Sequence, residues 1–164
     1  MDTLPSEEGL NWIKKQGYHL MAGPPQRMEM RQIAINGYFD SICDVPFTSN
    51  FWLETVEPGW LVLGFVPWTI GVGLKEQLTH LDQSLERCPN IAEATWFLLN
   101  CLMSHSIIDD FGIRLRTSTY LDGEHRTFAA IHCIRTRAER RLITINEVSD
   151  MSDSAVGLMG AAKL

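Results

Sequence analysis

The fold is decided by three runs of sequence: IRLRTSTY at residues 113–120, RTFAAIHCIR at 126–135 and RLITINEV at 141–148. Apolar and polar residues alternate along each run, which is the pattern of a half-buried β-strand. Short polar turns at residues 121–124 and 136–139 join the runs, and strands joined in this way pair antiparallel. We therefore predict a three-stranded antiparallel meander near the C-terminus.

Half of the positive charge of the chain lies on this meander, seven of 14 Lys and Arg residues. The arginines that we take as candidate partner contacts are Arg114, Arg116, Arg135, Arg137, Arg140 and Arg141. Antiparallel pairing brings the end of one strand beside the start of the next, so Arg135 and Arg141 should be close together, with Arg114 in the same neighbourhood. Guanidinium groups bind carboxylates and phosphates bidentately, which makes this edge a candidate docking face. The alternative is a solvated face that blunts a sheet edge, and charge reversal there should leave folding intact.

Length and charge favour one acidic domain with a basic region. We expect the 164 residues to form a single domain at 1–148 and a flexible tail at 149–164, which is rich in Ser, Gly, Ala and Met. Residues 1–110 hold 14 acids and 6 bases (−8), residues 111–148 hold 4 acids and 7 bases (+3), and the remainder gives −1. This charge distribution argues against nucleic acid as a partner, and it suits an acidic partner on the basic region or a basic partner elsewhere on the molecule.

The four cysteines show neither metal-binding nor redox spacing, and apolar residues surround Cys43, Cys88, Cys101 and Cys133. We expect buried thiols. The N-terminus does not have the pattern of a secretory signal. The longest uncharged run, residues 60–74, is too short to span a bilayer. These features predict a cytoplasmic protein that does not enter a membrane.

Turn residues and periodicity predict the elements before the meander. A short helix should begin after Ser6 and end at Gly17. Two antiparallel hairpins should follow, formed by strands 28–35 and 38–43 and by strands 51–56 and 60–66.

Two helices are predicted next. Leucines spaced four and three apart indicate a surface helix from residue 74 to about 88. Asn90 should cap a second helix, with Glu93 as its capping-box partner. That helix runs to about Ile108 and is apolar on nearly every side, so we expect it to be the central, buried helix of an α+β fold.

The sequence contains no recognisable catalytic motif. His105 lies four residues before Asp109 and could share a helix face with it, but one such pair is a weak metal signal, so we expect no metal. The two glycines of Gly71-Val72-Gly73 lack the third glycine of a dinucleotide-binding turn. We predict no catalytic residues and no cofactor. The lack of a catalytic motif in the sequence favours a protein that is not an enzyme.

Aromatic residues crowd between positions 47 and 68. Most should fill the core. An exposed Trp68 would mark a partner surface, because Trp and Arg are the residues that interfaces favour.

The predicted order of helix, strands, two helices and strands is similar to that of the small acidic chaperones that escort bacterial type III secretion substrates. The similarity covers most of the chain as an order of elements and rests on no motif. Members of that family usually end with a helix, whereas this chain has a third predicted strand at residues 142–148. The resemblance implies a non-enzymatic protein-binding module of the chaperone or adaptor kind. A homodimer through the central helix or a sheet edge is a further prediction.

A second hypothesis belongs to another class of protein. A small-molecule-binding domain or an enzyme could hold an anionic ligand in a pocket between the curved sheet and the central helix. The polar groups that meet the ligand would be His105, Arg114 and Arg116.

Overall fold

The computed structural model describes residues 4–35, 38–66, 69–104, 114–122, 127–135, 141–151 and 156–162. In chain order its elements are α1 (Glu7–Lys15), β1 (His19–Ala22), β2 (Met28–Glu29), α2 (Met30–Ile33), β3 (Phe39–Ile42), the 3-10 helix η1 (Asn50–Leu53), β4 (Thr55–Val56), β5 (Trp60–Val66), α3 (Leu74–Thr79), β6 (Glu86–Arg87), α4 (Ile91–Met103), β7 (Arg114–Tyr120), β8 (Thr127–Arg135), β9 (Arg141–Ser149) and β10 (Val156–Ala162).

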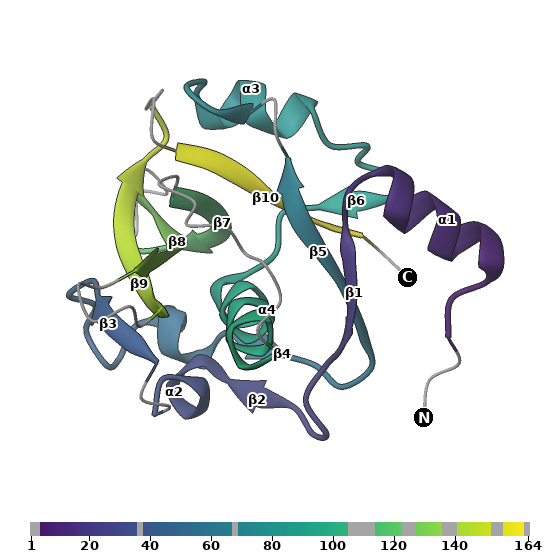
Figure 1. The fold of residues 1–164 in the computed structure, drawn as a ribbon. Coiled ribbons are helices and arrows are strands. Elements are labelled where there is room, and N and C mark those ends of the chain that lie inside the picture. The colour runs from purple at the N-terminus through teal and green to yellow at the C-terminus, as the bar shows by residue number, and fades with distance from the viewer. Residues whose placement is uncertain are drawn as a thin grey trace.

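The fold is α+β, as predicted, and is built around α4. An eight-stranded sheet with the order β1-β5-β10-β7-β8-β9-β3 curves around this helix, and β6 pairs with β10 (Figure 1). We call the face towards α4 the inner face and the opposite face the outer face. Helices α1 and α3 lie outside the curve of the sheet, whereas α2 and the small β2-β4 sheet lie at its lower end (Figure 1).

The predicted meander is present as β7, β8 and β9. β8 pairs antiparallel with both neighbours, and its register with β9 is continuous from Thr127 opposite Ser149 to Arg135 opposite Arg141. The odd-numbered residues Leu115, Ile131 and Ile143 enter the core together with α4. Their even-numbered neighbours therefore lie on the outer face.

The meander does not end the sheet, because β10 follows it. β10 lies between β5 and β7, antiparallel to the first and parallel to the second. Six of its seven residues are buried. The prediction of a flexible tail is therefore wrong for residues 156–162, which form an interior strand of the sheet.

Glycines in β5 and β10 make room for Tyr18. Gly64 lies directly opposite Gly160, and a β-carbon added at either position would overlap the Tyr18 side chain. Burial, followed by a hydrogen bond to Glu86, raises the pKa of Tyr18 well above its usual range. An aromatic ring that covers a glycine pair in this way replaces the side-chain packing that the glycines cannot provide.

Both predicted N-terminal hairpins are wrong. Residues 30–33 form helix α2, since Met30 and Ile33 are buried at helical spacing and Glu29 forms a capping box with Gln32. β3 pairs in parallel with β9. β4 pairs with β2, so β5 is a strand as predicted but has β1 and β10 as its partners.

The two helices after β5 are present with different lengths. α3 ends at Thr79 rather than near residue 88. α4 begins as predicted: the Asn90 side chain accepts a hydrogen bond from the Glu93 amide at 2.9 Å, and the Glu93 carboxylate accepts one from the Asn90 amide at 3.0 Å. Ten of its thirteen residues are buried. Within the ranges that the structure describes, no helix is long and apolar enough to cross a membrane.

Candidate functional site

Arg135 and Arg141 form a cross-strand pair at the end of the meander. They are the last residue of β8 and the first of β9, directly opposite each other, which confirms their predicted proximity. Arg135 is exposed and Arg141 is half-buried. Strand alternation places both on the inner side, beyond Cys133 and Ile143. Two guanidinium groups at adjacent positions repel each other, so an anionic group bound between them would stabilise the pair.

Arg114 lies at the same end of the meander but on the outer face. The pairs Leu115–Ile131 and Arg116–Ala130 extend to Arg114 opposite His132. Burial, with the nearby charge of Arg114 as the second cause, lowers the pKa of His132. Arg114 therefore presents its charge to a different surface from that of Arg135 and Arg141.

Arg116 is fully buried, so the prediction of a solvated side chain is wrong for this residue. Its exposed fraction is 0%. It hydrogen-bonds to the Gln77 side-chain oxygen and, at 2.7 Å, to the Ser149 carbonyl, and its guanidinium lies 5.8 Å from the centre of the Phe128 ring. Arg116 thus ties α3 to the end of β9. Charge reversal here would bury an uncompensated carboxylate, so a variant that includes it is expected to unfold.

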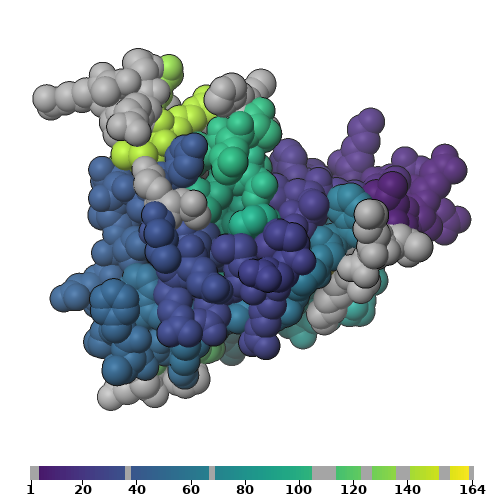
Figure 2. All heavy atoms as spheres, turned by 90° about the horizontal axis from the view of Figure 1, so that it is seen from below, coloured from purple at the N-terminus to yellow at the C-terminus, as the bar shows by residue number. Residues whose placement is uncertain are grey.

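The backbone of Tyr38 lies beside β9, close to Arg141. The carbonyl of Tyr38 accepts a hydrogen bond from the Ile143 amide at 2.7 Å, and the Tyr38 side chain is 41% exposed. Seen from below, α4 lies next to β9 (Figure 2). We call Tyr38, Arg135 and Arg141 the arginine end.

Four predicted site residues lie outside the described ranges: Trp68, His105, Arg137 and Arg140.

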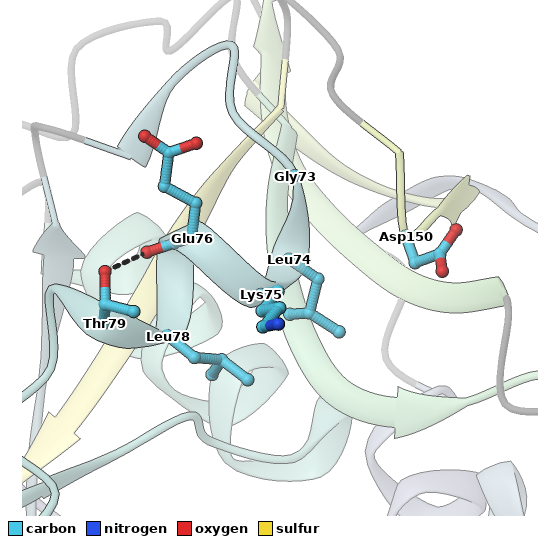
Figure 3. A pocket seen from close by; sticks show the side chains of 7 residues that line it. All are labelled: Gly73, Leu74, Lys75, Glu76, Leu78, Thr79 and Asp150. Carbon is cyan, nitrogen blue, oxygen red and sulfur yellow. Dashed lines mark hydrogen bonds between the residues drawn. The ribbon is translucent and has the colours of Figure 1, made fainter.

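A cavity of about 720 Å³ opens elsewhere, between α3 and the chain that follows β9. Leu74 and Leu78 supply apolar surface, with Lys75, Glu76 and Asp150 around them (Figure 3). None of the predicted site residues that the structure describes lines it. Arg116 supports both walls, since its partners Gln77, Ser149 and Met151 belong to α3 and to the segment after β9.

Sequence reasoning missed an ionic cluster at the start of α4. Arg87 binds the Glu93 carboxylate through two hydrogen bonds of 2.7 and 2.5 Å. The side chain of Glu54 lies near Glu93: burial, then the charge of Glu93, raises the pKa of Glu54, while a hydrogen bond from Thr119 opposes the shift. The capping box was visible in the sequence, but no local pattern could place Glu54 beside it.

Glu54→Gln is expected to be more stable than the parent protein at neutral pH. A carboxyl whose pKa is raised on folding holds its proton more tightly in the folded state than in the unfolded state. The parent protein therefore loses stability as the pH rises from the unfolded-state pKa of about 4.3 through the higher folded-state pKa. Glu54→Gln does not lose stability in this pH range, so it should be more stable than the parent above the range and no more stable below it. Thermal melts across this pH range measure it. An equal gain in Glu147→Gln, which removes an exposed carboxylate from β9, would contradict the explanation.

None of the four cysteines forms a disulfide. Burial raises the pKa of Cys88 to about 12 and that of Cys101 to about 11, so both stay protonated and are poor nucleophiles at neutral pH. Among the described residues, no group of three or more His, Cys, Asp or Glu side chains could hold a metal ion.

Comparison with known proteins finds no family model, no curated protein and no solved structure that matches this chain.

Proposed function

We propose that this chain is a non-enzymatic protein-binding module, of the chaperone or adaptor kind, that holds an acidic segment of a partner protein at the arginine end. The observation that carries the proposal is the position of Arg135 opposite Arg141, with Tyr38 beside β9. Arginine and tyrosine together are enriched at the centres of protein interfaces. A partner carboxylate would bridge the two guanidinium groups, while the exposed part of the Tyr38 ring would cover an apolar neighbour.

The basic residues here belong to a chain whose net charge is −6. An acidic partner would be repelled by most of the molecule and attracted only at this end, which favours one orientation of docking. The four free thiols support a reducing compartment such as the cytoplasm. A homodimer through the outer edge of β1 or β3 remains a prediction, which sedimentation of the purified protein would test.

The alternative of an anionic-ligand pocket between the sheet and α4 has weaker support. In the described residues that space holds core side chains, including Leu98, Leu99, Ile131 and Ile143. Arg114 and Arg116 belong to the outer face, and His105 lies outside the described ranges.

Charge reversal at the arginine end is expected to abolish partner binding while the fold is kept. Arg135→Glu/Arg141→Glu should lower the amount of partner retained by the tagged protein from a cell extract by about tenfold or more, since each lost interface ion pair costs about 1–3 kcal/mol. Mass spectrometry identifies and quantifies the partner, and circular dichroism checks the fold.

The matched control is Lys14→Glu/Lys15→Glu in α1, which makes the same change in net charge at two exposed residues. Equal loss of the partner in both variants would show a general charge effect. Undiminished binding by the arginine variant would show that the interface does not lie at this end of the molecule.

A further inference from the structure

A row of polar side chains crosses the outer face of the meander, where the neighbouring positions are mostly apolar. The register places Arg114 of β7 opposite His132 of β8, His132 opposite Thr144 of β9, and Thr144 opposite Ser41 of β3. Adjacent strands lie about 4.8 Å apart, so side chains at directly opposite positions are within reach of one another. Four strands thus contribute a guanidinium, an imidazole and two hydroxyls to one line.

Two buried atoms in this row have no hydrogen-bond partner. Thr144 is 6% exposed, and its Oγ1 is unpaired. The Nδ1 atom of His132 is also buried and unpaired. More than nine in ten buried polar groups in proteins are hydrogen-bonded. Two neighbouring exceptions on facing positions therefore indicate that a further group completes the site.

The charge on this face selects an anion. The outer-face positions of β8 and β9 carry no acidic residue: they are Phe128, Ala130, His132 and Ile134 on one strand and Leu142, Thr144, Asn146 and Val148 on the other. β7 contributes Arg114 and the buried Arg116, and it contains no acid at all. Glu147, the acidic residue of β9, alternates to the inner side. On β3, Asp40 is exposed and lies next to Ser41, three strands from Arg114. Among these strand positions, positive charge therefore predominates at the Arg114 end of the row.

We propose that Arg114, His132 and Thr144 bind a phosphate group, either free phosphate or a phosphate monoester. The guanidinium fork of Arg114 would hold two phosphate oxygens, while the imidazole N–H of His132 and the hydroxyl of Thr144 would donate to the others. A carboxylate has two oxygens for these donors, whereas phosphate has enough oxygens for all of them. Arg114 and His132 are half-buried, so the row is open to solvent at these two residues.

This site is separate from the proposed docking surface. Arg135 and Arg141 alternate to the inner side, and Arg114, His132 and Thr144 to the outer side. Variants of one set leave the other set intact, so either proposal can fail alone.

Titration with inorganic phosphate, followed by NMR of the histidine side chains near pH 7.5, tests the site. We expect saturable shifts at His132 and a higher His132 pKa with phosphate bound, because a nearby anion favours the imidazolium form. Thr144→Val should weaken binding at least fivefold. It keeps the side-chain shape and removes an unpaired hydroxyl, so it should fold as well as the parent or better. Arg114→Gln should weaken binding by a similar factor.

The control is Arg135→Gln, which removes one positive charge at the same end of the meander and should leave the phosphate affinity unchanged. Unshifted His132 resonances at high phosphate would overturn the proposal. So would equal weakening by Arg135→Gln and Arg114→Gln, which would show attraction to net charge alone. Acetate that binds as tightly as phosphate would refute recognition of a phosphate group.

Discussion

A chain that ends at residue 155 is expected to lose its cooperative unfolding transition. β10 supplies three large buried side chains, Val156, Leu158 and Met159, and each contributes about 1.5–3 kcal/mol by burial. Removal of β10 also leaves β5 and β7 without their shared hydrogen-bonding partner. The combined loss matches the whole stability of an ordinary domain, about 5–15 kcal/mol.

Circular dichroism and thermal melts of this truncation measure the effect. The matched control ends at residue 162, which keeps all of β10, and it should unfold like the parent. A cooperative transition in the shorter chain near the parent's melting temperature would restore the interpretation of this segment as a dispensable tail.

The sequence predicted those elements whose information is local. The meander has alternating strands and short turns, and its register follows from them. The start of α4 carries its own signal in Asn90 and Glu93, and the structure has the capping box that these residues predict. The strand at residues 60–66 was also predicted with the bounds that the structure has.

The elements that were mispredicted depend on distant partners. β3 pairs with β9, about a hundred residues further along the chain, and no local pattern specifies such a register. β10 lacks the β-branched alternation of an ordinary strand because both of its faces are buried. Its glycines resemble those of a flexible segment until the position of Tyr18 is known.

The candidate site also has features that local sequence predicts and features that depend on distant residues. Antiparallel register was sufficient to bring Arg135 and Arg141 together, and alternation was sufficient to put Arg114 and Arg116 on one face. Alternation cannot say what covers that face. Gln77 of α3 reaches Arg116 from a helix 39 residues away in sequence, so one arginine became a buried structural residue while its neighbour stayed near the surface.

Gly160→Ala is expected to destabilise the protein by about 1–3 kcal/mol, the usual cost of overpacking. The new methyl group would overlap the hydroxyl end of the Tyr18 ring, and the Val66 side chain, 3.0 Å from the added carbon, leaves it little room to move. Tyr18→Leu removes the overlapping atoms, so Gly160→Ala should cost far less in that background. Urea unfolding of the two single variants and the double variant gives their coupling energy, expected to exceed about 1 kcal/mol. Additive effects would mean that Tyr18 does not lie over the glycine pair. Because the overlap needs β10 to lie beside β5 in this register, strong coupling would also establish the strand that the sequence alone does not reveal.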